Sequence, residues 1–352
     1  MNATHQKNIS AVNTPSLVSI DSASRQKTWQ QCLSEQIMDP LVLIERLGLS
    51  DAFAKSWKAQ ARKADREFQV KVSEHYLSLM EQGNPNDPLL LQVLADPAEN
   101  KESKQGVLDP LGERALNRQH NLLRKYRSRV LVTVNSICPI HCRYCFRRHY
   151  DYPSSSTQVS IAALQTLVQK DSSIDEVILS GGDPLLSSDR QLAKYIEAVD
   201  GQESIKTLRI HTRTPIAIPN RLTKELISLL TTCRVKVVLV LHSNHANEIS
   251  AELKTALEPL RSRVTLLNQS VLLRGVNDTS ADLCKLSRAL FEIGVLPYYL
   301  HLLDPVKGAM HFDVSDADGL ALINEMRSKL AGYLVPRLVR EQPGESSKTV
   351  IA

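Results

Sequence analysis

The sequence predicts an α/β protein built around a parallel sheet. From about residue 129, short runs of β-branched and apolar residues alternate with segments in which apolar residues recur at helical spacing. Six such strand–helix repeats follow one another, and this alternation is typical of parallel strands joined by helical crossovers. Six repeats suit either an open doubly wound sheet or a barrel of about six strands.

The region before the repeats has a different character. Residues 1–30 are polar and rich in Ser, Thr and Asn, which favours a flexible N-terminal tail. The segments 39–50 and 74–96 space Leu and Ile as helices do, the second with a Gly-Asn-Pro break. Residues 31–120 are therefore expected to form a helical region that ends in a polar connecting loop over 97–120.

Each repeat of the core, residues 121–335, can be assigned to a strand and a helix. The strands are expected at 130–134, 176–180, 207–211, 235–242, 264–273 and 298–303. The helices are expected at 161–170, 190–200, 220–230, 247–260, 280–294 and 316–330. Residues 336–352 remain as a C-terminal segment.

Unusual polar clusters follow nearly every expected strand. Three cysteines come after the first, "SGGDP" after the second, "HTRTP" after the third, "HSNH" after the fourth and "HLLDP" at the end of the sixth, while "NQS" interrupts the fifth. Loops are polar in most proteins, but such repetition is not expected of chance. Because the carboxyl ends of parallel strands build the active site in α/β folds, we expect these clusters to form one shared active site at that edge of the sheet.

Composition and targeting signals limit the classes of function. The 352-residue chain carries a net charge of +5 spread along the sequence, whereas nucleic-acid-binding proteins usually concentrate their basic residues. No signal-peptide pattern or bilayer-length apolar run is present, so we expect a cytoplasmic protein that binds neither nucleic acid nor membrane. Cys32, Cys233 and Cys284 are expected to be buried free thiols.

The segment "CPIHCRYC" places Cys138, Cys142 and Cys145 within eight residues. Soft thiolates bind zinc or iron–sulfur clusters. A structural zinc site needs a fourth ligand, for which His141 and His149 are candidates, although His141 is poorly placed beside Cys142. A 4Fe-4S cluster normally takes four cysteines, so three on one loop would leave one iron open to bind a ligand. The residues favour an open cluster, with zinc and unliganded thiols as alternatives.

The spacing Cys-x-x-x-Cys-x-aromatic-Cys after the first of six β/α repeats resembles the signature of the radical S-adenosylmethionine (SAM) superfamily. In that superfamily the open iron chelates SAM, and one electron from the cluster cleaves it to a 5′-deoxyadenosyl radical that abstracts a substrate hydrogen. The resemblance implies a partial (β/α)6 radical-SAM barrel with an N-terminal helical region. It also implies that Tyr144 lies near the adenine, and that Gly181, Gly182 and Asp183 belong to the loop that receives the methionyl amino group.

A longer series of motifs is more specific. Over roughly residues 75–350 the chain resembles the lysine 2,3-aminomutase family, through "CRYCFRRHY", "SGGDPL", "RTPIAIP", "NHANE", "LLNQSVLLRGVND", "PYYLHLLD" and "PGESSKT" in that order. It is most similar to the branch that makes β-lysine for modification of elongation factor P, in which a ligase-like enzyme attaches the β-lysine. The resemblance implies an isomerase that converts free L-lysine to β-lysine, the R isomer in that branch, with SAM and pyridoxal 5′-phosphate (PLP).

The resemblance assigns the residues that would hold PLP. Lys348 matches the lysine that forms the Schiff base, and Arg129 matches an arginine at the phosphate, for which a planar guanidinium is well suited. Lys125 stands where the aminomutases have a second arginine. Residues 345–347, Glu-Ser-Ser, replace a run of glycines in the family, which could change how the phosphate is held.

Further matches concern the substrate and SAM. Arg147 matches the arginine that binds the lysine carboxylate, Asp304 matches an acid that binds the ε-ammonium group, and Glu341 falls where the family has a second aspartate. The residues implied at the SAM site are Arg213, His242 and Gln269. A carboxylate pair favours a cationic side chain. The alternatives are an aminomutase for another amino acid and, less favoured, a non-catalytic iron–sulfur scaffold protein.

The resemblance also implies partners. The cluster would be reduced by a one-electron donor, a flavodoxin-like protein or a reductase. Donors of this superfamily are often acidic, and we expect the basic run Arg143, Arg147 and Arg148 to lie near their docking site. The aminomutases carry zinc-binding cysteines in a C-terminal segment, whereas no cysteine follows Cys284 here, so no structural zinc is expected.

Overall fold

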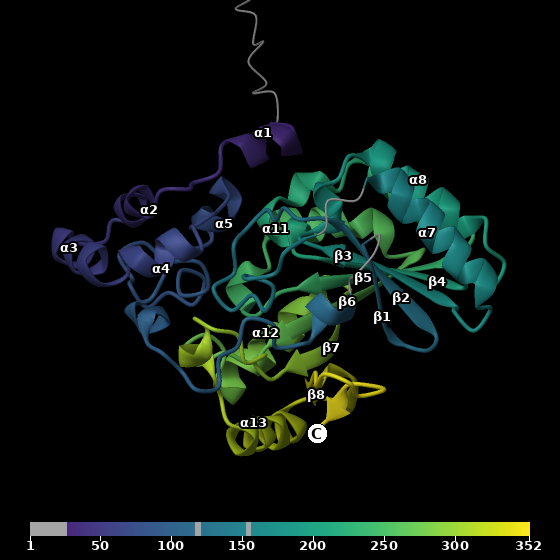
Figure 1. The fold of residues 1–352 in the computed structure, drawn as a ribbon. Helices are drawn as coiled ribbons and strands as arrows, with labels where there is room; N and C mark the ends of the chain where they lie inside the picture. Colours follow the sequence, from purple (N-terminus) through teal and green to yellow (C-terminus); the bar gives the residue numbers. More distant parts are fainter. Residues whose placement is uncertain (1–26, 117–120, 153–155) are drawn as a thin grey trace, which may run out of the picture.

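The computed structural model describes residues 27–116, 121–152 and 156–352, so most of the expected N-terminal tail lies outside the described residues. Within these ranges, nine strands form one sheet in sequential order. The strands from β2 to β8 run parallel, whereas β1 and β9 pair antiparallel at the two edges. The chain is thus an α/β protein with a mostly parallel open sheet (Figure 1).

Strand bounds follow the apolar runs of the sequence. The strands are β1 Leu122–Tyr126, β2 Arg129–Asn135, β3 Glu176–Gly181, β4 Thr207–Thr212, β5 Lys236–His242, β6 Val264–Val271, β7 Leu296–His301, β8 Arg337–Arg340 and β9 Thr349–Val350. All six expected strands are confirmed, as β2 to β7. The edge strands β1 and β9 and the short β8 were not predicted.

Six helices of the core each begin after a Ser or Thr that caps them. These helices are α7 Thr157–Lys170, α8 Asp189–Asp200, α10 Lys224–Thr232, α11 Ala251–Leu257, α12 Ser280–Glu292 and α13 Asp316–Lys329. Their N-caps are Ser156, Ser188, Thr223, Ser250, Thr279 and Ser315, whose side chains accept a backbone N–H of the first turn. Caps of this kind fix where each crossover helix starts. The short helix α9 Thr214–Ala217 follows β4 directly.

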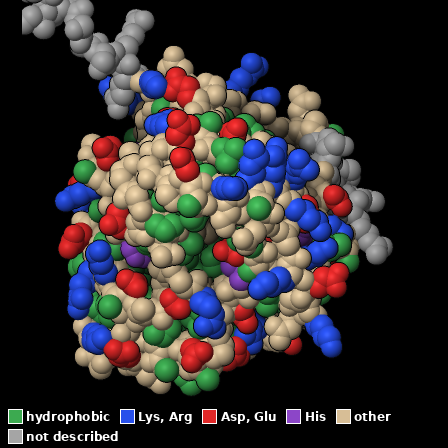
Figure 2. All heavy atoms as spheres, turned by 90° about the vertical axis from the view of Figure 1, so that its left-hand side faces the viewer, with side chains coloured by type: hydrophobic (Ala, Val, Ile, Leu, Met, Phe, Trp, Pro, Cys, Tyr) green, Lys and Arg blue, Asp and Glu red, His purple; other side chains and the backbone are tan. Residues whose placement is uncertain are grey.

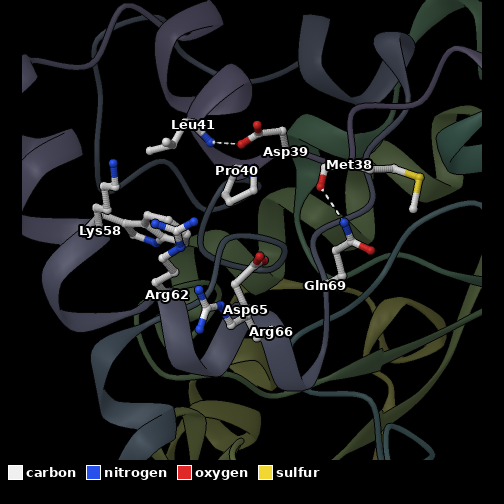
Figure 3. Close-up of a pocket in the computed structure, with 10 residues that line it drawn as sticks. Met38, Asp39, Pro40, Leu41, Lys58, Arg62, Asp65, Arg66 and Gln69 are labelled. Carbon is white, nitrogen blue, oxygen red and sulfur yellow. Dashed lines mark hydrogen bonds between the residues drawn. The ribbon is translucent and has the colours of Figure 1, made fainter.

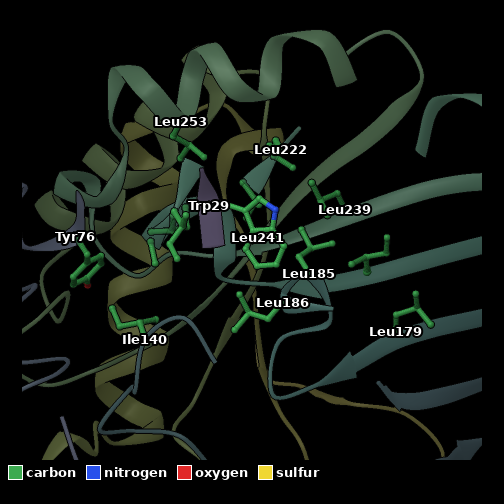
Figure 4. Close-up of a cluster of buried hydrophobic side chains, with 14 of the residues drawn as sticks. Trp29, Tyr76, Ile140, Leu179, Leu185, Leu186, Leu222, Leu239, Leu241 and Leu253 are labelled. Carbon is green, nitrogen blue, oxygen red and sulfur yellow. The ribbon is translucent and has the colours of Figure 1, made fainter. Parts of the chain in front are cut away.

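The N-terminal helices lie together on one side of the sheet in Figure 1. They are α1 Trp29–Ser34, α2 Pro40–Arg46, α3 Asp51–Gln60, α4 Arg62–Glu67 and α5 Glu74–Ser78. Their apolar side chains join those of the strands in one core cluster. Figure 4 shows Trp29 of α1 beside Leu222 and Leu185 of the sheet region, and the Arg221 guanidinium lies 4.6 Å from the Trp29 ring centre. The helical region and the sheet therefore stabilise one another through shared burial.

Two N-terminal segments differ from expectation. After α5, the expected second helix within 74–96 is instead a series of turns, in which Asp87 Oδ1 accepts the amides of Leu89 and Leu90. The loop over 97–120 is also more than a connector, since it holds a 3-10 turn, Pro97–Asn100, and the short helix α6, Glu113–Leu116. Each carries one buried glutamate, Glu99 and Glu113.

The remaining expectations concern membranes and thiols. Among the described residues, no helix combines the length and apolar character needed to cross a bilayer. Cys32, Cys233 and Cys284 are free, and Cys284 is buried as expected, whereas Cys32 and Cys233 are half-buried.

Candidate active site

The loop with the three cysteines follows β2 and is fixed by the N-terminal region. His141 N donates to Lys71 O at 3.1 Å, and Arg143 N donates to Gln92 O at 2.8 Å. Within the loop, Cys145 N donates to Cys142 O at 3.0 Å. The cysteine loop is thus held between the sheet and the segment that follows α4, rather than extending into solvent.

The three thiols lie close enough to affect one another's ionisation. Burial, followed by repulsion from Cys145, Asp183 and Cys142, raises the pKa of Cys138 well above its usual value. Burial and the nearby Cys142 raise the pKa of Cys145 to about 11. Three thiolates in such a place need a cation to compensate them, as the irons of a cluster would. In a 4Fe-4S cluster each cysteine binds a different iron. Among the described residues, no three His, Cys, Asp or Glu side chains are placed to hold one metal ion together.

The Gly-Gly pair after β3 packs directly on the strand end that leads into the cysteine loop. Gly181 has φ +126°, a conformation that favours glycine, and an added Cβ would lie 2.5 Å from Asn135 O. At Gly182 an added Cβ would collide with Ile137 O and would lie 2.7 Å from Ile137 C. Gly182 N and Asp183 N donate to Asn135 O and Ile137 O at 2.8 and 2.7 Å. The two glycines are thus required by close backbone packing.

We expect Gly182→Ala to destabilise the protein by about 1–3 kcal/mol, because the backbone of the cysteine loop must shift to admit the methyl group. Iron bound after reconstitution should fall with it. Chemical denaturation and iron analysis measure the two effects. Gly332→Ala is the control, since no atom lies within 4 Å of the added Cβ. Unchanged stability and iron content in Gly182→Ala would show that the packing is looser than described.

Asp183 links this loop to the next strand. Its carboxylate accepts the Thr212 hydroxyl at 2.7 Å and the amides of Arg213, Thr214 and Leu185 at 2.6, 2.9 and 3.1 Å. The Gly181 carbonyl is also engaged, by Arg147 Nη1 at 3.0 Å and the Tyr152 hydroxyl at 2.9 Å. No described residue donates to the Gly182 carbonyl.

Arg213, at the end of β4, lies beside the second cysteine. Its Nη1 donates to Cys142 Sγ at 2.9 Å and also contacts the Tyr144 hydroxyl. Its Nη2 donates to Glu248, Gln92 and Tyr76 at 3.0, 2.8 and 3.0 Å. Burial alone would lower the pKa of Arg213, but Cys142, Tyr144 and Glu248 raise it well above its usual value. A fixed positive charge at this point suits both thiolates and an anionic ligand.

His242 and Gln269 are neighbours on β5 and β6. Gln269 Nε2 lies 2.9 Å from His242 Nε2, so a neutral imidazole accepts the amide proton. Burial, with Arg213 and Arg147 nearby, lowers the pKa of His242 to about 3 and keeps the ring neutral. The His211 ring on β4 lies 5.7 Å from that of His242, and its buried Nε2 has no partner among the described residues.

A continuous chain of ion pairs joins the C-terminal segment to the cysteine loop. Lys348 Nζ contacts Glu341, whose carboxylate lies 3.7 Å from Lys125 Nζ. Lys125 in turn lies 3.3 Å from Glu113, and Glu113 binds Arg147 through Nε and Nη2 at 2.7 and 3.0 Å. Five charged side chains, three from residues 113–147 and two from residues 341–348, therefore meet inside the fold.

The same chain brings the two edges of the open sheet together. The Tyr126 hydroxyl on β1 donates to Glu341 at 2.7 Å, just after β8. Opposite charges keep both acids ionised: burial would raise the pKa of Glu341, but Lys348, Tyr126 and Lys125 lower it below its usual value. Arg147 and Lys125 likewise lower the pKa of Glu113 despite its burial. The polar contacts take the place of the strand pairing that would close a barrel.

Asp304, which follows β7, has a pKa shifted in the opposite direction from those of Glu341 and Glu113. Burial raises the pKa of Asp304 to about 7, although Lys348 and Lys125 act in the opposite direction. Glu341 and Glu113 add to the rise. His301, at the end of β7, also has a buried Nε2 without a partner among the described residues, and burial lowers the pKa of His301 well below its usual value. Polar atoms of this kind, turned inward without partners, indicate a ligand site.

Of the residues expected to hold PLP, Lys348 and Lys125 belong to this chain, whereas Arg129 lies beside it. Arg129 begins β2, where its guanidinium lies 5.0 Å from the Tyr126 ring centre. Its buried Nε lies 3.7 Å from the Glu176 carboxylate and has no hydrogen-bond partner among the described residues. Lys348 Nζ lies 5.9 Å from the Tyr299 ring centre. An amine, two cationic side chains and aromatic rings fit a phosphorylated aromatic aldehyde. Arg129 lies at the start of β2 and the cysteines follow its end, so the two expected cofactor positions are separated along that strand.

The structure therefore brings most expected site residues together but gives several of them protein partners. The Asp183 carboxylate is engaged by the backbone and Thr212, and the Arg213 guanidinium is enclosed by protein groups. Four residues of this site were missed by the sequence analysis: Gln92, Glu113, Tyr126 and Glu248. The signal for Glu113 was weak, since it is one of two acids in "DPLGE" within a polar loop.

Comparisons with known proteins bear on this site. The 4Fe-4S single cluster domain family matches residues 127–254. Two curated proteins named L-lysine 2,3-aminomutase are similar over nearly the whole chain. The one from Haemophilus influenzae is 42% identical, covering 93% of this chain and 96% of its own. The one from Escherichia coli is 41% identical, covering 95% and 96%. Among solved structures, a radical SAM methyltransferase from Sphaerobacter thermophilus aligns at 17% identity over 62% of this chain and 68% of its own, with a TM-score of 0.45.

Proposed function

Because the chain belongs to the L-lysine 2,3-aminomutase family, we propose that it is an isomerase that moves the α-amino group of free L-lysine to C3, giving β-lysine. The observation that carries the proposal is the ion-pair chain from Lys348 to Arg147. It combines an amine for PLP with carboxylates and a guanidinium that complement the two charged ends of lysine. The 4Fe-4S family match over the cysteine loop supports the radical half of the chemistry.

Cys138, Cys142 and Cys145 would hold a 4Fe-4S cluster, and the Gly182 carbonyl would accept the amino group of SAM. When bound, the cluster supplies the electron that cleaves SAM to a 5′-deoxyadenosyl radical. Arg213 holds a positive charge beside Cys142, and Tyr144 packs with Phe312 at 6.4 Å between ring centres. Gln269 fixes the tautomer of His242 through the hydrogen bond between them.

Lys348, Arg129 and Lys125 would hold PLP. When bound, PLP supplies a carrier for the migrating nitrogen. Lys348 would bond to the aldehyde carbon, and the two cationic side chains would bind the phosphate. Glu341 holds the Lys348 ammonium before the cofactor arrives and would accept a proton from it. The Tyr126 hydroxyl keeps the Glu341 carboxylate in place.

Arg147 would bind the lysine carboxylate, and Asp304 with Glu341 would bind the ε-ammonium group. Arg147 is already paired with Glu113 and donates through Nη1 to Ser180 and Gly181. Glu113 therefore orients the guanidinium. We expect Glu113→Gln to raise the KM for lysine about tenfold, because an amide oxygen replaces a charge-assisted pair. Steady-state kinetics measure it, and Glu113→Asp, which retains the charge, should show a smaller rise; equal KM values in all three proteins would exclude this role.

The pKa of Asp304 predicts a pH dependence of lysine binding. A raised pKa means that the carboxyl is neutral below about pH 7 and ionised above it, whereas the ε-ammonium of lysine stays charged throughout. We expect kcat/KM for lysine to fall about tenfold per pH unit below that point. Initial rates of β-lysine formation between pH 5.5 and 8.5 measure the profile. Asp304→Asn should remove this limb, and a wild-type profile without a limb near pH 7 would contradict the assignment.

Transfer of a labelled nitrogen tests the proposed function directly. The reconstituted enzyme is incubated anaerobically with L-lysine labelled with ¹⁵N at the α-amino group, together with SAM, PLP and dithionite. The expected product carries the label on C3, as seen by NMR. Label that stays on C2 while SAM is cleaved would refute lysine amino migration. Parallel reactions with glutamate and arginine test the alternative of another amino acid, and the absence of any SAM cleavage would favour the scaffold alternative.

Two finer assignments belong to the same proposal. We infer that the product is the R isomer and that it supplies the ligase-like enzyme that modifies elongation factor P. The support is the similarity to the relatives above, together with the motifs "NHANE" and "PYYLHLLD". Chiral chromatography of the product tests the first assignment. Addition of the enzymatic product to the ligase and the factor, with mass spectrometry of the factor, tests the second.

A further inference from the structure

The basic run of the cysteine loop is not a docking surface. Arg143 is fully buried and binds Glu99 through Nε and Nη2 at 2.8 and 2.6 Å. Arg148 Nη2 donates to the same carboxylate at 2.8 Å, and its side chain is only 2% exposed. Arg147 is paired with Glu113. Because their charges are neutralised inside the fold, these three arginines do not themselves bind an electron donor, and the expectation that a donor docks near them stays a prediction.

A different basic surface lies directly behind the cysteine loop. Residues 51–71 contain six Lys and Arg against three Asp and Glu. Among them Lys58, Arg62 and Arg66 are exposed, and no described residue pairs with their side chains. They line a surface pocket of about 270 Å³ between α2 and α4. We define the α3–α4 face as these three cations and the pocket they line.

The pocket combines unpaired cations with engaged acids. Figure 3 shows Arg62 and Arg66 reaching from α4 toward the start of α2. Asp39 Oδ1 accepts the amide of Leu41 at 2.8 Å, and Asp65 Oδ1 accepts that of Val70 at 2.9 Å. Both acids thus serve the protein's own backbone, while the cations are available to a partner. Figure 2 shows the side of the molecule on which these helices lie, where blue Lys and Arg side chains are interspersed with red Asp and Glu side chains.

A single layer of residues separates this pocket from the cysteines. Gln69 lines the pocket, and its carbonyl lies 2.8 Å from Nδ1 of His141, the residue before Cys142. The Phe68 ring stacks on His141 with 5.0 Å between ring centres. Lys71, whose carbonyl accepts the amide of His141, is close enough to Cys138 for their charges to interact. The α3–α4 face is therefore the outer side of the wall against which the cluster would lie.

From these observations we propose that the α3–α4 face is the docking surface for an acidic one-electron carrier protein, which reduces the cluster through the segment 68–71 and His141. The proposal rests on the proposed function, because only an enzyme that needs a reduced cluster needs such a partner. The transfer moves one electron and no atoms: the carrier is oxidised by one electron and the cluster is reduced by one. Unpaired cations beside a covalent and hydrogen-bonded route through Gln69 and His141 to Cys142 complement an acidic carrier in charge and position.

Charge reversal at this face tests the proposal. The variant Lys58→Glu/Arg62→Glu/Arg66→Glu is compared with a control of equal charge change, Lys170→Glu/Lys236→Glu/Arg263→Glu. The control residues are exposed: Lys170 ends α7, Lys236 begins β5 and Arg263 directly precedes β6, so they lie toward the amino ends of the strands, away from the cysteine loop. The probe is a bacterial flavodoxin reduced by its NADPH-dependent reductase. Its Kd is measured by calorimetry with cluster-loaded and with cluster-free protein, and 5′-deoxyadenosine formation is measured with flavodoxin and with dithionite.

We expect the α3–α4 variant to bind flavodoxin about tenfold or more weakly at low salt, with or without the cluster, because three attractive charges become repulsive. Flavodoxin-driven SAM cleavage should fall likewise, while dithionite-driven cleavage stays within twofold of wild type. Equal binding by variant and wild type, equal loss in variant and control, or no binding of flavodoxin to the wild type would each overturn the proposal. No dithionite-driven cleavage by the wild type would instead refute the proposed function, which separates the two failures.

Discussion

A chain in which Cys142 is replaced by Ala is expected to lose its 4Fe-4S cluster and, with it, SAM cleavage, by a factor on the order of a thousand or more. Cys145 and Cys142 are near enough to raise the pKa of Cys138, and Cys142 also raises the pKa of Cys145, so the three thiols form one ligand set. Removal of one leaves two protein ligands and a gap beside Arg213, whose Nη1 donates to Cys142 Sγ at 2.9 Å. Two thiolates do not retain a cluster that normally needs more.

The measurements are iron and sulfide content, the electron paramagnetic resonance signal of the reduced cluster, and 5′-deoxyadenosine formation. Cys233→Ala is the matched control, because Cys233 is a half-buried free thiol at the end of α10 and should change none of the three. Thermal unfolding of the cluster-free proteins checks that Cys142→Ala still folds. A Cys142→Ala protein that keeps its iron and its resonance signal would show that this cysteine is not a ligand.

The parallel core could be read from the sequence because its strands carry a local signal. Strands β2 to β7 carry runs of apolar and β-branched residues that stand out against the polar loops that follow them. The same loops hold the cysteines, the Gly-Gly pair and Arg213, which is why the site could be located before the structure was seen. The strands β1 and β9 have no such signal. "LLRKY" and "TV" become strands only because a neighbouring strand end offers them a partner.

Charge pairing was the part of the site that the sequence could not specify. Arg143 and Arg148 resemble surface cations, yet both bind Glu99, which lies more than forty residues earlier in the chain. Glu113 pairs with Arg147 across 34 positions, and Tyr126 with Glu341 across 215. Such contacts depend on how the sheet curves and which loops it brings together, and no periodicity in the sequence records them. The burial of these arginines was not foreseen, and Glu113 was missed, for this one reason.

Replacing Lys348 by Arg is expected to abolish amino migration, by a factor on the order of a thousand or more, while leaving the cluster intact. Arginine keeps the positive charge that pairs with Glu341, so the ion-pair chain to Lys125 and Glu113 should persist. It cannot supply the amine that bonds to an aldehyde, because guanidinium stays protonated. The comparison of Lys348→Arg with Lys348→Met therefore separates the loss of the amine from the loss of the charge.

Borohydride reduction of the PLP-loaded protein, followed by peptide mass spectrometry, measures which lysine holds the cofactor. In the wild type the label should lie on Lys348, and in Lys348→Arg no labelled peptide should be recovered, while the cluster signal stays unchanged. The decisive control is Lys125→Arg, since Lys125 is the other amine on the same carboxylate, 3.7 Å from Glu341. Its label should remain on Lys348. Recovery of the label on Lys125 in the wild type would reverse the two assignments. The phosphate would then have to face the paired strands β8 and β9 instead of the start of β2.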